Sequence, residues 1–331
     1  MLKTLAQPQP NPLAELYAPI ADELRQVEEL LANELTSQYA FVNELLQKSN
    51  RLSGKRLRPA LLLLTAKAFG NSTPEHIKLA AAVEMVHTAT LIHDDILDSA
   101  DQRRHSPTIN YEFGNQVAIL TGDFLFSHAF YLTSTLETTF AAREIGSATN
   151  KVCEGEIRQI GTKEQFDITE SEYIEIIDAK TAVLCSCAAK LGAHYAGIHS
   201  KGVEAAAQYG TQLGIAFQIV DDLLDILGDE SDAGKSLGTD LEQKKPTLPI
   251  IHFLQSLPAA EKTQFLQQLL NGELAAELVR ERLVASGSIQ YAQNAAHRFA
   301  ELAAESISLA PDSPTKSILL GLPTFVLNRS R

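Results

Sequence analysis

Two acidic segments with the same spacing are the residues of this 331-residue chain best suited to chemistry. The first reads DDILD over residues 94–98 and the second reads DDLLD over residues 221–225, each among Ile, Leu and Val. On a helix, the outer carboxylates of each segment share one face and repel each other unless a cation lies between them. One such segment is commonly a solvated helix face. Two copies favour sites for Mg²⁺, which takes carboxylate oxygens and completes its shell with water and substrate phosphates.

Cationic residues that could hold a diphosphate occur near the first acidic segment. The stretch SGKRLRP places Lys55 and Arg58 beside a glycine just before an expected helix, and Arg103 and Arg104 follow the first segment. Such a turn can offer backbone N–H groups and cationic side chains to an anion. Taken alone, residues 53–59 could equally be an ordinary basic loop.

Further candidates lie at helical spacing from the acidic segments. His87 precedes the first segment by two helical turns, and Gln218 precedes the second by one turn, so both could share the faces of the carboxylates. The pair Lys180–Thr181 is surrounded by apolar residues, where a charge is costly unless it has an anionic partner. A lone histidine on a helix is more often structural, and only its neighbours favour binding.

The glycine-containing loop over residues 228–249 follows the second acidic segment and contains Lys235 and Lys245. Its composition would allow it to close over a phosphate group.

Composition limits the function classes. The net charge is −13 and no long basic stripe is present, which argues against a nucleic-acid partner. The three cysteines, of which Cys185 and Cys187 fit an apolar helix, indicate reduced thiols. We see no signal peptide and no run of about 20 apolar residues that could span a membrane. We therefore expect a soluble, cytoplasmic protein.

The distribution of proline predicts the fold class. No proline occurs between Pro107 and Pro246, and a proline inside a helix costs about 3 kcal/mol, so the middle of the chain should be helical. We expect an all-α fold, with a flexible tail over residues 1–12 and one domain of long antiparallel helices around a central cavity over residues 13–331. The helices are predicted at residues 14–48, 57–69, 74–99, 107–134, 137–162, 169–196 and 199–228, with shorter ones from 246 to 327.

Together, these motifs resemble the trans-isoprenyl diphosphate synthases, the polyprenyl synthetase family, over residues 50–255. The matching elements are GKRLRP, DDILD followed by RR, GD, GEIRQ, the pair Lys180–Thr181, FQIVDDLLD and GKSLGTDL with KKPTLP. The resemblance implies an all-helical prenyltransferase, usually a homodimer, that elongates an allylic diphosphate with isopentenyl diphosphate and uses about three Mg²⁺ ions.

The resemblance also implies roles for individual residues. Asp94 and Asp98 would bind two ions and Asp221 the third, with Lys180 as a further catalytic group. The residues implied for isopentenyl diphosphate are Lys55, Arg58, His87 and Arg104. The residues implied for the allylic diphosphate are Arg103, Lys180, Thr181, Gln218, Lys235 and Lys245. Lys244 stands where the family commonly has glycine, which leaves open which of the two neighbouring lysines reaches the phosphate.

Product length is expected to depend on the small residue Ala89. In the family, a bulky residue one or two turns before the first acidic segment closes the product tunnel. One helical turn rises about 5.4 Å, roughly one isoprene unit, so a path along Ala89, Val86 and Ala82 predicts a product of about six to ten units. The stopper is expected on a neighbouring helix, with Phe124, Phe126 and Phe130 as candidates. Alternatively, Ala89 is small only for helix packing.

Three other functions compete with long-chain synthesis. A synthase of medium-chain products, geranylgeranyl or farnesyl diphosphate, would share every motif. A terpene cyclase or head-to-head condensing enzyme would not need the basic stretch over residues 53–59. A non-catalytic subunit of a heteromeric synthase often lacks one acidic segment, whereas both are present here.

Overall fold

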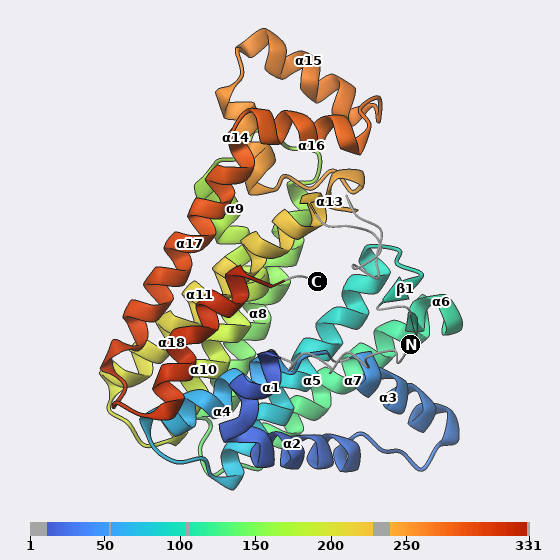
Figure 1. Cartoon of the computed structure of the whole chain (residues 1–331). Helices are drawn as coiled ribbons and strands as arrows, with labels where there is room; N and C mark the ends of the chain where they lie inside the picture. Colours follow the sequence, from blue (N-terminus) through green and yellow to red (C-terminus); the bar gives the residue numbers. More distant parts are fainter. Residues whose placement is uncertain (1–11, 53, 104–105, 228–238, 330–331) are drawn as a thin grey trace, which may run out of the picture.

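The chain folds almost entirely into helices, which confirms the predicted all-α class (Figure 1). The computed structural model describes residues 12–52, 54–103, 106–227 and 239–329. The predicted tail lies outside these residues, except for its last residue, Pro12, with which the first helix begins.

The elements of the N-terminal half are α1 (Pro12–Tyr17), η1 (Ala18–Ile20), α2 (Ala21–Glu34), α3 (Ala40–Leu52), α4 (Leu57–Phe69), α5 (Pro74–Leu97), β1 (Gln102–Arg103), β2 (Ser106–Pro107), α6 (Ile109–Phe113), α7 (Asn115–Ser134) and α8 (Phe140–Gly161). The elements that follow are α9 (Glu170–Ile177), η2 (Asp178–Ala182), α10 (Val183–Tyr195), α11 (Ser200–Leu227), α13 (Thr239–Glu242), α14 (Leu248–Ser256), α15 (Ala259–Leu270), α16 (Ala276–Ala285), α17 (Ser288–Ser306), η3 (Ile307–Leu309) and α18 (Pro314–Leu327).

Small residues let the central helices pack closely. Ala80, Ala81 and Ala82 of α5 are fully buried, as are most residues of α4. Two glycines of α11 lie against α10 and η2. An added Cβ would lie 2.5 Å from the backbone oxygen of Cys185 in α10 at Gly210, and 2.5 Å from the Cα of Ala182 in η2 at Gly214. This close approach holds the end of α11 against the segment that contains Lys180 and Thr181.

Helix α5 begins at Pro74, as predicted, and hydrogen bonds fix its first turn. The backbone N–H of Thr73 donates to Nδ1 of His76 at 2.9 Å, and Nε2 of His76 lies 3.1 Å from the carbonyl oxygen of Gly192 in α10. His76 is fully buried, and burial lowers its pKa. This neutral ring therefore joins α5 to α10 at the end opposite the first acidic segment.

Three of the predicted helices are interrupted. The helix predicted over residues 14–48 breaks between α2 and α3, where Thr36 Oγ1 donates to the carbonyl oxygen of Asn33 and Asn43 accepts from the backbone N–H of Ser37. Such local side-chain bonds compete with helix hydrogen bonds. The helix predicted over 107–134 breaks at Gly114, which has a φ of 85°. The helix predicted over 169–196 contains a π-helical turn, η2.

A short hairpin and a second apolar cluster complete the fold. Strands β1 and β2 pair antiparallel, with Gln102 opposite Pro107, a feature that the sequence did not predict. Helices α14–α16 lie at one end of the molecule (Figure 1) and join residues of α9, α11 and α17 in an apolar cluster of their own. Among the described residues, no helix combines the length and the apolar character needed to cross a membrane.

Candidate active site

A cavity of about 480 Å³ lies between the helices that carry the two acidic segments. Its walls come from the loop before α4 and from α5, α8, η2, α11 and α18. Many residues predicted for the site line it: Lys55, Arg58, His87, Asp94, Asp98, Arg103, Lys180, Thr181, Gln218 and Asp221. The fold thus gathers residues that are up to 166 positions apart in the sequence around one space.

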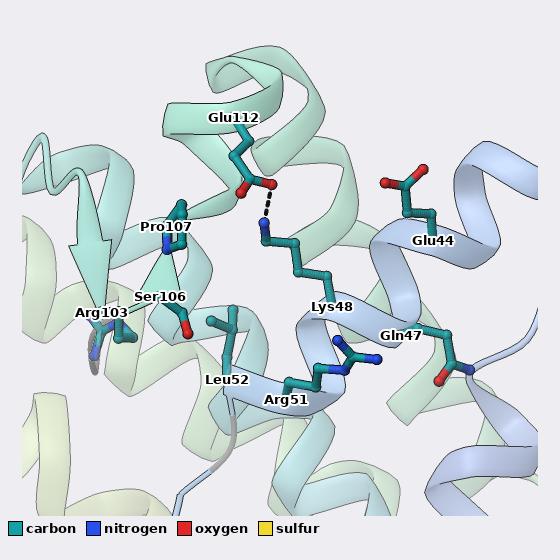
Figure 2. Close-up of a pocket in the computed structure, with 9 residues that line it drawn as sticks. All are labelled: Glu44, Gln47, Lys48, Arg51, Leu52, Arg103, Ser106, Pro107 and Glu112. Carbon is teal, nitrogen blue, oxygen red and sulfur yellow. Dashed lines mark hydrogen bonds and ion pairs between the residues drawn. The ribbon is translucent and has the colours of Figure 1, made fainter.

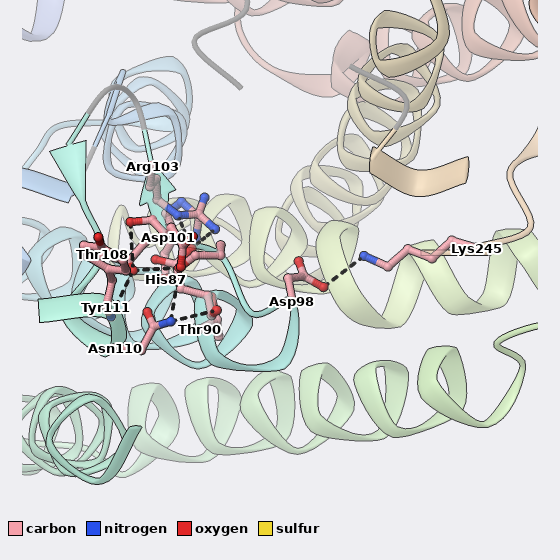
Figure 3. Close-up of polar contacts among 11 residues, drawn as sticks. His87, Thr90, Asp98, Asp101, Arg103, Thr108, Asn110, Tyr111 and Lys245 are labelled. Carbon is pink, nitrogen blue, oxygen red and sulfur yellow. Dashed lines mark hydrogen bonds and ion pairs between the residues drawn. The ribbon is translucent and has the colours of Figure 1, made fainter. Parts of the chain in front are cut away.

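Two carboxylates of the first acidic segment face this cavity. Burial raises the pKa of Asp94; the nearby charge of Lys180 opposes that rise and the charge of Glu156 adds to it. Asp98 forms the C-cap of α5, and its Oδ1 lies 3.2 Å from Nζ of Lys245 (Figure 3). The predicted lysine of the distant loop thus reaches the first segment.

The middle carboxylate, Asp95, instead anchors the hairpin. It is 2% exposed, and Nε and Nη2 of Arg103 both donate to its Oδ1 at 2.8 Å. Asn110 Nδ2 donates to the carbonyl oxygens of Asp95 and Ala100, and Thr108 Oγ1 donates to Ala100 at 2.7 Å (Figure 3). Asp95 therefore holds Arg103 at the cavity wall.

The second acidic segment has a different environment. Nη2 of Arg329 donates to Oδ1 of Asp221 and to the carbonyl oxygen of Phe217, both at 2.9 Å, and the guanidinium stacks 3.6 Å above the Phe217 ring. Asp225 is buried and accepts from the backbone N–H of Asp240 at 3.1 Å. The middle residue, Asp222, is 5% exposed and faces the interior.

Lys180 is held by the π-helical turn η2. Its Nζ donates to Glu156 Oε2 at 2.5 Å and to Gln159 Oε1 at 2.8 Å, both on α8. Gly155 permits this approach, because a Cβ there would lie 2.7 Å from the backbone nitrogen of Lys180. Burial alone would lower the pKa of Lys180, but the charges of Asp94 and Glu156 raise it above its usual value. Lys180 is therefore a cation at neutral pH.

Arg56 fixes the backbone of the basic loop before α4. This residue has a φ of 49°, in the left-handed region, and its guanidinium donates to both carboxylate oxygens of Glu28 and to Glu84 Oε1 at 2.9 Å. The Tyr17 hydroxyl donates to the carbonyl oxygen of Lys55 at 3.0 Å. These bonds fix the backbone on which Lys55 stands.

Arg58 and His87 meet within the cavity wall. Nη1 of Arg58 lies 3.1 Å from Nε2 of His87, and because a guanidinium only donates, the histidine nitrogen accepts. Together they form one side of a basic corner that also includes Lys55.

The remaining predicted residues lie elsewhere. Lys245 lines an adjoining cavity of about 80 Å³, which also touches Lys180, Thr181 and Gln218. Ala89 is fully buried in the main apolar cluster and does not line the 480 Å³ cavity. The predicted residues Arg104 and Lys235 lie outside the described residues.

Several residues of the site have no role that was predicted from the sequence. Glu156 and Gln159 belong to the GEIRQ stretch, and their spacing of three already places them on one helix face. Arg329 gave no signal, because it lies 108 positions from its partner Asp221. Tyr173 gave no signal of a role in the site either, because a tyrosine in an apolar helix is expected to pack in the core.

A second cavity of about 410 Å³ is lined by residues of α3, the β1–β2 hairpin and α6 (Figure 2). Arg103 lines both cavities, so the β1 strand forms part of the wall between them. Lys48 of α3 pairs with Glu112 across this space, and Arg51 lies beside it. Its lining has fewer of the predicted residues than the first cavity.

The donor set fits Mg²⁺ bound together with a phosphate ligand. Among the described residues, no three His, Cys, Asp or Glu side chains gather closely enough to hold an ion by themselves. Mg²⁺ is commonly bound by one or two carboxylates, with water and substrate phosphates completing its shell. Burial raises the pKa of Asp94 despite the nearby charge of Lys180, and a bound cation would favour the ionised carboxylate.

A helical bundle with two opposed acidic segments and a basic corner around one cavity is the architecture of a prenyltransferase. The family model for polyprenyl synthetase matches residues 40–285, and the chain belongs to this family. It is 34% identical to octaprenyl diphosphate synthase of Escherichia coli over 94% of this chain and 97% of that protein. It is 37% identical to geranylgeranyl diphosphate synthase of Methanosarcina mazei over 83% of this chain and 86% of that protein.

A solved structure is similar along nearly the whole chain. The crystal structure of a decaprenyl diphosphate synthase from Rhodobacter capsulatus matches with a TM-score of 0.91 and 33% identity, covering 97% of this chain and all of that one.

Proposed function

We propose that this prenyltransferase elongates an allylic diphosphate with isopentenyl diphosphate to a long-chain all-trans polyprenyl diphosphate. The observation that carries the proposal is the shared cavity: the basic corner, the carboxylates of both acidic segments and the Lys180–Thr181 turn all line it. Similarity to an octaprenyl and a decaprenyl diphosphate synthase supports the long product.

The two substrates are proposed to bind on opposite sides of the cavity. Lys55, Arg58 and His87 would hold the isopentenyl diphosphate, together with Arg104. The proposed residues for the allylic diphosphate are Arg103, Lys180, Thr181, Gln218, Lys235 and Lys245. The support for this map is that the basic corner and the Lys180–Thr181 turn come from different elements, so two diphosphates can be held by separate groups.

Asp94 and Asp98 would hold two Mg²⁺ ions, and Asp221 would hold the third. When bound, these ions would neutralise the charge that develops on the leaving diphosphate. Lys180 adds a fixed cation on the same side, and it is kept charged by Asp94 and Glu156.

The reaction then needs positioning rather than a protein nucleophile. The allylic C–O bond breaks and its electron pair leaves with the diphosphate. The double bond of isopentenyl diphosphate adds to the allylic cation, and the released diphosphate accepts the proton lost from the adjacent carbon. The protein's part is to orient the two chains and to exclude water through the apolar walls of α5 and α11.

The direct test is product analysis of the purified chain with Mg²⁺, isopentenyl diphosphate and each short allylic primer. A long-chain product is expected. A geranylgeranyl or farnesyl product would instead establish the medium-chain alternative, a cyclic hydrocarbon would indicate a cyclase, and no product from any primer would indicate a non-catalytic subunit.

The two diphosphate sites should be separable by kinetics. Changing Lys55 or Arg58 should mainly raise the KM for isopentenyl diphosphate, whereas changing Lys180 or Lys235 should mainly affect the allylic partner. Each lost charge-assisted contact contributes about 1.5–3 kcal/mol. Equal increases of both Michaelis constants in all four variants would contradict the map.

Product length is proposed to depend on Ala89. This residue packs in the same apolar cluster as Phe124, Phe126 and Phe130 of α7, so a tunnel at this point would run between α5 and α7. Ala89→Phe should shorten the product to about three or four units, because each turn of helix closed to the product removes roughly one isoprene unit. Chromatography of the dephosphorylated products measures this; an unchanged distribution from an active, folded variant would exclude Ala89 from the tunnel wall.

We also propose a homodimer that acts in the cytoplasm. Support for a dimer comes from α7, where Ile119, Leu120 and Tyr131 are 45%, 67% and 62% exposed. Such an apolar helix face is typical of subunit contacts. The three free cysteines, two of them buried in α10, agree with a reducing compartment. The molar mass measured by light scattering tests the dimer.

A further inference from the structure

A continuous chain of hydrogen bonds runs from the interior to the cavity wall. The Tyr173 hydroxyl donates to Oδ2 of Asp222 at 2.7 Å, and Nε2 of Gln218 donates to Oδ1 of the same carboxylate at 2.8 Å. Thr181 Oγ1 in turn donates to Oε1 of Gln218 at 2.8 Å. Thr181 and Gln218 line the 480 Å³ cavity, whereas Tyr173 is 3% exposed and lies behind them.

The chemistry of each group fixes the direction of this chain. Oδ1 of Asp222 accepts, so the Gln218 amide must turn its NH₂ group toward it and its carbonyl oxygen toward Thr181. The hydroxyl hydrogen of Thr181 is therefore used within the chain, and the oxygen keeps its lone pairs for the cavity.

We propose that Asp222 and Tyr173 are positioning residues that orient Gln218 and Thr181. Within the proposed allylic site, these two residues would then face the allyl group rather than the phosphates and present oxygen lone pairs to the allylic cation. The inference rests on the proposed use of this cavity for ionisation of the allylic diphosphate. An electron-rich wall stabilises positive charge that develops on carbon, and an oriented dipole in a buried site needs no rearrangement during the reaction.

Asp222→Asn tests the direction of the chain. Asparagine satisfies all its neighbours when its oxygen accepts from Tyr173 and its NH₂ group donates to Gln218. The amide of Gln218 must then reverse and donate to Thr181, which frees the hydroxyl hydrogen to point into the cavity. We expect kcat to fall about 10- to 100-fold, the size of one charge-assisted hydrogen bond, with both Michaelis constants within threefold of wild type.

A double-variant cycle separates positioning from a general structural role. Thr181→Val removes the hydroxyl, so adding Asp222→Asn should then lower kcat by less than threefold. Additive losses would overturn the proposal, and so would a large rise in the Mg²⁺ concentration needed by Asp222→Asn, since that would make Asp222 a metal ligand. Wild-type turnover of Thr181→Val would instead count against the proposed use of the cavity.

Three further variants guard against misfolding. Gln218→Met removes the hydrogen bonds that join Thr181 to Asp222 without altering Asp222. It should reproduce the loss in kcat, and turnover within twofold of wild type would overturn the proposal.

Tyr209→Phe is the matched control for Tyr173→Phe. Tyr209 of α11 is buried, as Tyr173 of α9 is. Its hydroxyl, however, donates to the carbonyl oxygen of Leu319 at 2.6 Å, away from the cavity. Tyr173→Phe should lower kcat, whereas Tyr209→Phe should lower only thermal stability; equal turnover in both would contradict the role of Tyr173.

Discussion

The two acidic segments have the same letters at the same spacing but different surroundings. In the first, Asp94 and the 34% exposed Asp98 both line the cavity, and the buried Asp95 is neutralised by the cation Arg103. In the second, only Asp221 lines that cavity; Asp222 and Asp225 are buried.

The motif alone therefore does not determine how many carboxylates are available to a ligand. The first segment lies at the last turn of α5, so Asp98 falls at the C-cap and turns outward. The second lies two residues before the end of α11, so its last carboxylate is still inside the helix and is covered by the residues around Asp240. The proposed ratio of two Mg²⁺ ions at the first segment to one at the second agrees with this difference.

The largest expected effect is a loss in the free energy of unfolding when Asp95 is replaced. Asp95→Ala would leave the guanidinium of Arg103, which is 12% exposed, without this carboxylate, and loss of one partner of a buried pair costs about 3–5 kcal/mol. Urea unfolding measures the change. Asp98→Ala is the control within the same segment, and its exposed pair with Lys245 should contribute about 1 kcal/mol or less. Equal losses would mean that the two positions do not differ in role.

The next largest effect is expected on turnover at the carboxylates that line the cavity. Asp94→Asn, Asp98→Asn and Asp221→Asn should each lower kcat about 100- to 1000-fold, because each removes a charge proposed to hold the ions that stabilise the leaving group. Circular dichroism should show an intact helical fold in all three. Turnover within tenfold of wild type in excess Mg²⁺ would remove that residue from the metal set.

The smallest effects are expected on the free energy of unfolding, when a cation that pairs with a carboxylate at the cavity is removed. Lys245→Met breaks a partly exposed pair with Asp98 and should change the free energy of unfolding by about 1 kcal/mol or less. Arg329→Met also removes the stacking on Phe217, so about 1–2 kcal/mol is expected. Urea midpoints compare the two variants, and a larger loss for Lys245→Met would reverse the order.

Much of the site could be predicted from the sequence because its chemistry is local in the chain. The paired carboxylates, Lys55 with Arg58, and Lys180 with Thr181 are each recognisable within a few residues, and the fold brings them to one cavity. The helix boundaries at Pro74 and Leu57 were also predicted, since proline and the following apolar run leave little choice.

The features that could not be predicted depend on contacts between segments far apart in the sequence. The pairing of Arg329 with Asp221 and of Tyr173 with Asp222 joins residues 108 and 49 positions apart, and neither has a local signal. Strands β1 and β2 have two residues each, too few for a periodic pattern, and the contact that holds β1, between Arg103 and Asp95, has no local signal. The break at Gly114 was missed because a single glycine can also lie inside a helix.

The π-helical turn at Asp178–Ala182 has a consequence for the tolerance of this segment to change in length. A π-helical turn holds about one residue more than an α-helical turn, so it accommodates an extra residue within an otherwise continuous helix. Deleting Ala179 would allow a regular α-helical turn to form here. Lys180 and Thr181 would then be displaced from Glu156 and Gln218, even though no side chain of the site had been replaced. In this stretch of the chain, the number of residues is itself a functional property, as much as their identity.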